Sequence, residues 1–169
     1  MRRTRFSAMD CSIAQTLDII GEWWTLLVLR DAFQGVRRFE DFQRDLGIAR
    51  NVLTDRLRTL VDAGILERRR YHDQPERFEY RLTEKGLDLY PVLIGLMRWG
   101  DKWSARGRRP PVVLTHAACD HDVMPVMTCP HCGDELGARD MRFRRRRRVS
   151  RRAGSSPPAR PTRRARQSR

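Results

Sequence analysis

The segment from Phe39 to Gly64 narrows the choice of fold more than any other part of the chain. Apolar residues recur in it three and four positions apart, which is the spacing of a helix with one buried face. The first run is Phe39, Phe42 and Leu46, and the second is Leu53, Leu57, Leu60 and Val61. Because the tripeptide Gly47-Ile48-Ala49 lies between them, the sequence predicts two short helices joined by a tight turn, a helix-turn-helix.

A hairpin is predicted directly after this pair of helices. Beyond Gly64 the apolar period changes from that of a helix to that of a strand. Residues 65–71 form the first predicted strand and residues 72–76 a polar turn, after which Phe78, Tyr80 and Leu82 alternate with charged residues. The predicted fold class is therefore mainly α with a small β-hairpin wing (α+β), a winged helix-turn-helix.

Further helices are predicted on both sides of this unit. Helical periodicity runs over residues 11–35, and Gly21 divides that stretch in two. Thr83 supplies a hydroxyl cap for a long helix over residues 84–104, which Pro91 is expected to bend. This long helix is apolar on more than one side, so the sequence predicts a subunit interface along it.

The net charge of +14 is concentrated at one end of the chain. Residues 1–104 carry 18 Lys and Arg against 16 Asp and Glu, residues 105–141 carry 4 against 5, and residues 142–169 carry 13 against none. The overall charge therefore says nothing about whether the folded part binds nucleic acid, because a solvated tail would give the same total. That inference has to rest on local pattern.

Composition divides the chain into five predicted parts. These are an N-terminal arm (1–10), the winged-helix domain (11–104), a linker (105–115), a Cys/His module (116–141) and a disordered Arg-rich tail (142–169). The tail holds almost no apolar side chains to offset the entropy of ordering it. It either binds phosphate backbones without sequence preference or is a solvated extension.

The Cys/His module has the spacing of a zinc site. Cys129 and Cys132 are two residues apart and precede a glycine, and His116 with Cys119 forms a second pair upstream, with His121 as an alternative to His116. Three thiolates and one imidazole would close a tetrahedral shell, which predicts one structural Zn²⁺. The alternative is a loose extension with free cysteines.

Many short motifs, in order along the chain, resemble the HxlR family of winged-helix regulators. They are Cys11, Leu17-Asp18-Ile19-Ile20-Gly21, Trp24-Thr25-Leu26-Leu27-Val28-Leu29-Arg30, Arg38-Phe39, Gly47-Ile48-Ala49, Leu53-Thr54-Asp55-Arg56-Leu57, Ala63-Gly64-Ile65-Leu66, Tyr80-Arg81-Leu82-Thr83, Gly86 and Trp99. The resemblance covers about residues 11–104. It implies a homodimer formed by the first helix and helix 84–104, with one recognition helix of each subunit in the major groove of double-stranded DNA.

The polar side of the predicted recognition helix, residues 50–63, agrees with this. With Leu53 at the centre of the buried face, the opposite face carries Asn51, Asp55 and Arg58, flanked by Arg50 and Thr54. Asn pairs bidentately with adenine and Arg with guanine, so Arg50, Asn51 and Arg58 are the candidates for base contacts. Arg56 lies nearer the core and is expected to reach a phosphate.

The predicted wing, residues 65–82, is basic enough to follow a DNA backbone or minor groove. Its candidate contacts are Arg68, Arg69, Arg70, His72 and Arg77. These patterns predict a sequence-specific regulator, with repression expected and activation left open. The alternative is a winged-helix protein-interaction module that does not bind DNA, in which the polar face is merely solvated.

Cys11 is a candidate redox or electrophile sensor. Cys11 resembles the reactive cysteine that some HxlR proteins have just before the first helix. At that position the helix N-terminus favours a thiolate. Ser12 stands where the family often has proline. The alternative is that Cys11 is a small buried apolar residue at the dimer interface.

Two other classes of protein are disfavoured. The winged-helix segment shows no paired carboxylates, no nucleophile with a partnered base and no phosphate-binding loop, so we do not expect an enzyme. No apolar run approaches the roughly 18 residues that cross a bilayer, so we expect a cytoplasmic protein without membrane contact. The sequence does not indicate a small-molecule effector.

Overall fold

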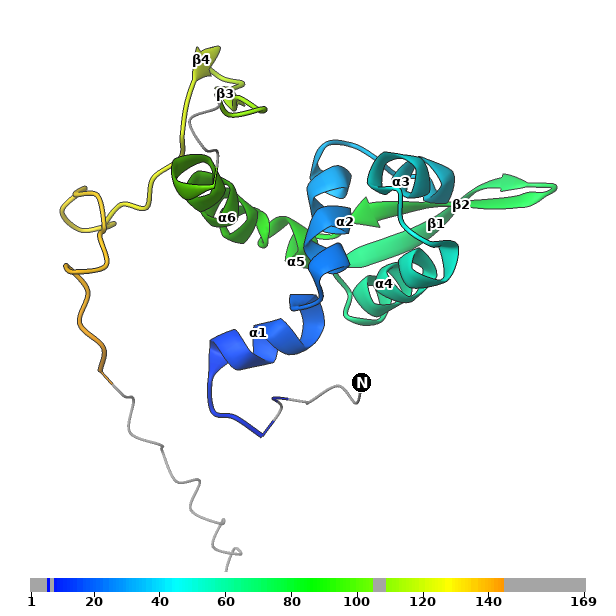
Figure 1. Ribbon diagram of the computed structural model, residues 1–169, viewed down its shortest axis with the longest axis horizontal. Coiled ribbons are helices and arrows are strands. Elements are labelled where there is room, and N and C mark those ends of the chain that lie inside the picture. The colour runs from blue at the N-terminus through cyan, green and yellow to red at the C-terminus, as the bar shows by residue number, and fades with distance from the viewer. Residues whose placement is uncertain (1–5, 7, 105–108, 145–169) are drawn as a thin grey trace, which may run out of the picture. The chain divides into compact units, whose positions relative to one another are not determined.

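A computed structural model of the chain describes residues 6, 8–104 and 109–144. Its helices and strands follow one another as helix, helix, helix-turn-helix, hairpin and two C-terminal helices (Figure 1). They are α1 (Ser12–Ile20), α2 (Trp23–Phe33), α3 (Phe39–Leu46), α4 (Arg50–Asp62), β1 (Leu66–Asp73), β2 (Glu76–Leu82), α5 (Glu84–Leu87), α6 (Tyr90–Trp103), β3 (Thr115–His116) and β4 (His121–Asp122). The predicted α+β winged helix-turn-helix is thereby confirmed for the first part of the chain.

The break between α1 and α2 lies at Gly21, as predicted. A Cβ atom at this position would stand 2.4 Å from the backbone oxygen of Leu17, so only glycine fits where the chain leaves α1. The backbone N–H of Gly21 donates to that same oxygen at 2.9 Å and closes the last turn of the helix. A residue with a side chain would therefore not fit at this break.

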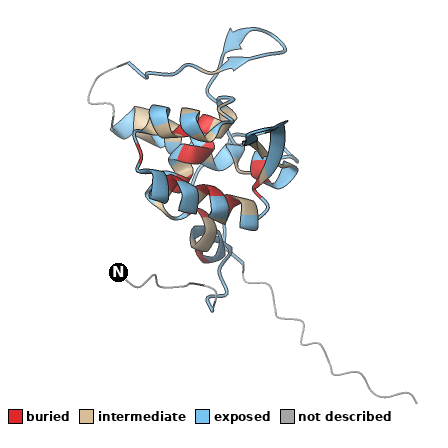
Figure 2. Cartoon of the chain, turned by 90° about the vertical axis from the view of Figure 1, so that its right-hand side faces the viewer, coloured by how far each residue is buried: buried red, intermediate tan, exposed pale blue. Residues whose placement is uncertain are grey.

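The core lies between α2, α3, α4 and the start of β1. Figure 2 shows the buried residues on the inward sides of these elements. The largest fully buried side chains are Phe42, Leu29, Leu53, Leu57, Leu60, Leu66, Val28 and Thr25. Both apolar runs that predicted the helix-turn-helix contribute to this set, and Gly47 adopts a left-handed φ of 60° at the end of α3. The helix-turn-helix prediction is confirmed.

The hairpin has longer strands and a tighter turn than predicted. The pairing of β1 with β2 is antiparallel and extends from Leu66–Leu82 to Asp73–Glu76, with an irregularity between Arg70 and His72. The predicted five-residue turn 72–76 was therefore wrong, because His72 and Asp73 still pair with β2. Proline has no backbone N–H to donate to a ladder, and the turn is confined to residues 74–75.

The predicted single helix 84–104 is two helices. Thr83 caps α5 as predicted, since its hydroxyl oxygen accepts a hydrogen bond from the backbone N–H of Gly86 at 3.1 Å. The helical stretch breaks after Leu87 and resumes at Tyr90, with Pro91 in the first turn of α6. A proline has no amide to donate and its ring collides with the carbonyl four residues earlier, so the chain breaks where a bend was expected.

The chain divides into two compact units, residues 1–125 and 126–169. The division falls inside the predicted Cys/His module 116–141, so its two ligand pairs belong to different units. The predicted tail lies almost wholly outside the described residues, as do most of the predicted arm and part of the predicted linker. Among the helices that the structure describes, none has the length and apolar character needed to span a membrane.

Candidate nucleic-acid interface

Helix α4 is held to the core by one face and exposes the other. Leu53, Leu57 and Leu60 are buried, and the opposite side carries exposed Arg50, Asn51, Thr54, Asp55, Arg58 and Asp62. The hydroxyl of Thr54 donates to the backbone oxygen of Arg50 at 2.8 Å, so its proton is already used within the helix. The structure therefore exposes the predicted recognition face, with Arg50 and Asn51 in the first turn.

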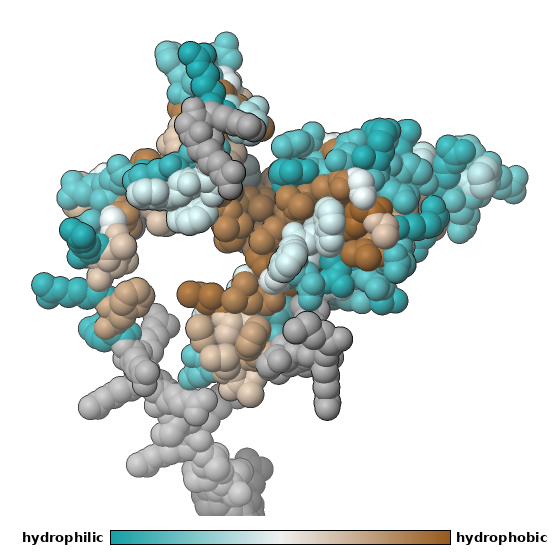
Figure 3. Space-filling view, viewed as in Figure 1, coloured by the Kyte–Doolittle hydropathy of each residue, from teal (hydrophilic) through white to brown (hydrophobic). Residues whose placement is uncertain are grey.

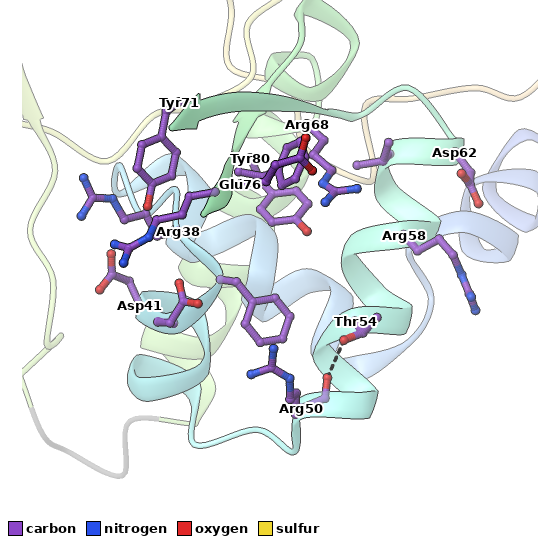
Figure 4. Close-up of a pocket in the computed structure, with 15 residues that line it drawn as sticks. Arg38, Asp41, Arg50, Thr54, Arg58, Asp62, Arg68, Tyr71, Glu76 and Tyr80 are labelled. Atoms are coloured by element: carbon purple, nitrogen blue, oxygen red, sulfur yellow. Dashed lines mark hydrogen bonds between the residues drawn. The ribbon is translucent and has the colours of Figure 1, made fainter. Parts of the chain in front are cut away.

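A groove of about 840 Å³ lies between α3, α4 and the hairpin (Figure 4). Five arginines line it, from α4, β1, β2 and the segment before α3: Arg38, Arg50, Arg58, Arg68 and Arg77. The same lining contains acidic residues, two of which are paired with arginines outside it: Asp41 with Arg44 at 2.9 Å, and Glu76 with Arg70 at 2.8 Å. The groove thus brings together guanidinium groups that are far apart in the sequence.

Three of these arginines stack on aromatic rings. The guanidinium carbon lies 4.9 Å from the ring centroid for Arg50 over Phe39, and 4.9 Å for Arg38 over Tyr71. For Arg68 over Phe78 the distance is 3.5 Å. Stacking on a ring fixes the plane of a guanidinium and leaves its edge for hydrogen bonds, which is the geometry that phosphate and guanine require.

Arg38 is placed by the hairpin and was missed by the sequence analysis. The backbone N–H of Tyr80 donates to the oxygen of Arg37 at 2.8 Å, and Arg38 forms an isolated bridge with Glu79. The segment before α3 therefore lies along β2, which brings Arg38 to the groove. Arg38-Phe39 stood in the sequence as a family motif, but only the pairing with β2 indicates its place.

Tyr80 supplies a neutral donor inside the groove. Burial raises the pKa of its phenol, the charge of Glu40 raises it further, and Arg68 opposes both. The phenol is therefore protonated at neutral pH. A half-buried hydroxyl beside arginines is suited to donate to a phosphate oxygen.

Several predicted contact residues are engaged by neighbours on their own element or in the same hairpin. Arg58 pairs with Asp55 at 2.8 Å, Arg69 with Glu67 at 2.7 Å, and the ring Nδ1 of His72 donates to the backbone oxygen of Pro75 at 3.0 Å. Arg70 pairs with both Asp73 and Glu76. These contacts lie at exposed positions, where an ion pair contributes little and a phosphate can replace the acidic partner.

Arg56 lies away from the groove. Its side chain is 18 % exposed and its Nη1 is 3.7 Å from Glu22, at the start of α2. Nε and Nη1 are buried and have no hydrogen-bond partner among the described residues. This position favours a role in holding α4 to α2, and a phosphate contact for Arg56 stays a prediction.

Cys11 is exposed in the single chain and occupies the N-cap position of α1. Its side chain makes no capping hydrogen bond to the helix. The thiol therefore lies at the positive end of a helix dipole, within reach of solvent.

The two predicted metal-ligand pairs each lie in a tight turn. In the first, Nδ1 of His116 is 3.2 Å from Sγ of Cys119, and His121 Nδ1 donates to the backbone oxygen of Cys119 at 2.6 Å. In the second, hydrogen bonds from the backbone of Cys132 and of His131, and then from the Cys132 side chain, lower the pKa of the Cys129 thiol. No three metal-binding side chains meet within the described residues, so the zinc site stays a prediction.

The turns share one backbone pattern although nothing in the sequence shows a repeat. The residue after the second ligand has positive φ in each, 56° at Asp120 and 80° at Gly133. The backbone N–H of that residue donates to the oxygen of the first ligand, His116 or Cys129, at 2.8 Å. Both turns therefore fold back on the first residue of their ligand pair in the same way.

Comparison with known proteins places the chain in a family. The model of the HxlR-like helix-turn-helix family matches residues 19–108. The uncharacterised HTH-type transcriptional regulator Rv3095 of Mycobacterium tuberculosis is 48 % identical over 130 residues, which are 77 % of this chain and 82 % of that protein.

Solved structures agree with this assignment. The crystal structure of PA1607, a candidate transcription factor, is 35 % identical with a TM-score of 0.74 and covers 84 % of this chain and 99 % of that one. The redox regulator HypR in its oxidised form is 36 % identical with a TM-score of 0.51 and covers 54 % of this chain and 96 % of that one. The chain therefore belongs to the family of HxlR-like helix-turn-helix proteins.

Proposed function

We propose that the protein is a homodimeric transcriptional regulator that binds double-stranded DNA in a sequence-specific way. The observation that carries this proposal is the groove between α3, α4 and the hairpin, in which three arginines are stacked on aromatic rings. The first turn of α4 enters the major groove, where Arg50 and Asn51 meet base edges. The hairpin then follows the adjacent backbone or minor groove.

The position of each arginine in the groove indicates which part of the DNA it contacts. Arg50 and Arg58 lie on the exposed face of α4 and read or flank the bases, whereas Arg38, Arg68 and Arg77 contact phosphates. Glu40, Asp41 and Asp62 of the lining repel phosphates from the places they occupy and so help to fix the register of the protein on the duplex.

A competition mobility-shift assay tests this function. We expect the full chain to prefer the DNA upstream of its own gene over random competitor, and the double variant Arg50→Ala/Asn51→Ala to lose that preference. The matched control is Arg44→Ala, an exposed arginine of α3 that does not line the groove. Preference that survives in the double variant would support the protein-interaction alternative.

The dimer is proposed from the two apolar sides of α6. One side, with Ile94 and Leu93, packs inward. The opposite side carries Val92, Trp99 and Trp103, and the two tryptophans are 62 % and 66 % exposed. Apolar side chains are also exposed on α1, among them Ile13 and Leu17. Figure 3 shows apolar side chains gathered over α1 and α2. Such a large apolar surface indicates an interface.

Repression is the expected outcome of binding. A dimer seated on upstream DNA occupies the sites that the transcription machinery needs. A reporter fused to the protein's own upstream region should be more active in a deletion strain than in the parent, and a less active reporter would indicate activation.

A second candidate function is oxidant or electrophile sensing through Cys11. The exposed N-cap position of Cys11 and the similarity to the redox regulator HypR favour it. Oxidation or arylation of the Cys11 thiol would place a bulkier group at the start of α1, next to the proposed interface. The test is DNA affinity before and after treatment with a quinone: Cys11→Ser should remove the response and leave affinity unchanged.

We also propose that His116, Cys119, Cys129 and Cys132 bind one structural Zn²⁺, with His121 as the alternative to His116. The shared backbone pattern of the two turns supports this, as does the lack of buried apolar residues in the described part of 109–144. Because such a segment cannot bury a core, a bound metal would supply its stability.

A further inference from the structure

A second cavity lies on the side of α2 that faces α6. It has a volume of about 670 Å³ and is bounded by α2, α6 and residues 111–114, all within the first unit. Its walls are mostly apolar and include Leu26, Phe33, Tyr90, Leu93 and Met97. Its size falls in the range of about 300–1,000 Å³ that is typical of small-molecule sites.

The rings of Phe33 and Tyr90 form part of this wall. Their centroids are 5.3 Å apart with an interplanar angle of 52°, so the rings are in tilted contact. The contact joins the C-terminal end of α2 to the start of α6 and holds that end of the cavity in place. An aromatic body of a ligand would find preformed ring surfaces there.

Asp101 lines the cavity and has one side-chain oxygen without a hydrogen-bond partner among the described residues. This atom, Oδ2, is buried. The other charged residue of the lining, Arg30, is already engaged, because its Nε and Nη2 contact Oδ1 of Asp31 at 2.8 and 2.7 Å. A buried carboxylate oxygen without a donor is costly, so a donor supplied by a ligand would be favoured.

We propose that this cavity is a binding site for hydrophobic cations, with the aromatic or aliphatic body against the apolar walls and an ammonium group at Asp101. A cation is favoured over a neutral donor because a charge-assisted hydrogen bond is about twice as strong as a neutral one. The same carboxylate disfavours an anion.

A ligand bound in this cavity would influence DNA binding. This extension rests on the proposed function. Leu26 lines the cavity and also packs against the core that holds α4. α6 forms the other wall and carries the proposed dimer face on its far side. A ligand between α2 and α6 would therefore act on the spacing of the two recognition helices in a dimer.

Three pyrene probes of matched shape test the site without DNA. They are 1-pyrenemethylamine, 1-pyrenemethanol and 1-pyrenecarboxylate, which are cationic, neutral and anionic at neutral pH. Fluorescence titration of the full chain should rank them in that order, with the cation bound about tenfold more tightly than the alcohol. Equal affinities, or an anion bound best, would overturn the proposal.

Variants locate the binding. Asp101→Asn should abolish the preference for the cation and keep the affinity for the alcohol, whereas Asp88→Asn, at an exposed position before α6, should change neither. Met97→Trp should fill the cavity and weaken all three probes. Far-UV circular dichroism checks that each variant is folded. A preference for the cation that persists in Asp101→Asn would show that the probe binds elsewhere.

A separate readout tests the regulatory extension. The DNA affinity of the full chain is measured with and without saturating 1-pyrenemethylamine, and we expect a change of about fivefold or more that Asp101→Asn removes. An unchanged affinity with a correct probe ranking would overturn only the regulatory role. Loss of DNA binding without any probe would count against the proposed function and not against the cavity.

Discussion

The guanidinium carbon of Arg50 lies 4.9 Å from the ring centroid of Phe39. These are the first residues of α4 and of α3, so the two helices of the helix-turn-helix meet through a cation–π contact at their N-terminal ends. Phe39 is itself packed against the core. The orientation of the Arg50 guanidinium, in the first turn of the recognition helix, is therefore supported by a residue that packs against the hydrophobic core.

Removal of the Phe39 ring should weaken DNA binding without disrupting the fold. Phe39→Leu keeps an apolar side chain in contact with the core but removes the π face below Arg50. An exposed cation–π contact contributes about 0.5–1 kcal/mol, so we expect a two- to fivefold loss of affinity for a specific site. The measurement is a double-mutant cycle with Arg50→Ala, and strictly additive effects would show that the ring does not orient the guanidinium.

The helices could be predicted from the sequence because burial of one helix face places apolar residues three and four positions apart. Phe42, Leu53 and Leu57 are fully buried, and each had been placed on an inward face by spacing alone. The break of α5 from α6 was not predicted. A proline signals an interruption, but only packing decides whether the helix bends or ends there.

The site could be predicted only in part. The exposed side of α4 follows from the helical period, but the aromatic partners of the arginines do not. Arg68 lies over Phe78 because the hairpin sets its register through a turn at residues 74–75, and the sequence indicated a longer turn. Arg38 depends in the same way on a backbone bridge to Glu79. Contacts between different helices and strands produce no periodic pattern in the sequence, so they could not be predicted from it.

Arg68 and Arg69 should differ in their effect on the salt dependence of DNA binding. Arg68 lines the groove over Phe78, whereas Arg69 pairs with Glu67 and does not line it. If Arg68 contacts a phosphate, Arg68→Ala should reduce the slope of log K against log salt by about 1. Arg69→Ala is the matched control and should leave the slope close to that of the wild type. Equal slopes for both variants would contradict this assignment of the wing.

Arg56→Met tests whether the guanidinium of Arg56 contacts DNA. Met matches the length of the arginine stem and removes two buried nitrogens that lack hydrogen-bond partners. The ion pair with Glu22 is long at 3.7 Å. We therefore expect the free energy of unfolding to change by less than about 1 kcal/mol, measured by urea titration, and specific DNA affinity to be retained. A loss of DNA affinity of tenfold or more would show that Arg56 contacts DNA.

Trp99→Glu should convert the proposed dimer to a monomer. The Trp99 side chain is on the outward apolar side of α6, and a carboxylate there would have to be buried without a partner. Sedimentation velocity of the full chain should show the change in mass, and DNA affinity should fall because two half-sites are no longer bound together. Glu84→Lys, a charge change at an exposed position of α5, should leave the dimer intact. A dimeric Trp99→Glu variant would move the interface elsewhere.

The proposed zinc site predicts how much zinc the chain binds and which residues bind it. The full chain, purified without chelator, should contain about one zinc per chain by mass spectrometry, and Cys129→Ser should lose most of it. Cys11→Ser is the matched control, because Cys11 is also an exposed free cysteine but lies at the N-cap of α1.

Removal of the metal should act locally. The winged helix has a core of its own, in which Phe42 and Leu57 are fully buried, whereas the described residues of 115–141 are nearly all exposed. Chelation should therefore increase proteolysis within 109–144 and leave the thermal unfolding of the winged helix unchanged. Zinc retained by Cys129→Ser at the wild-type level would show that the two turns do not bind it. In that case their shared hydrogen-bond pattern would be a property of short hairpins alone.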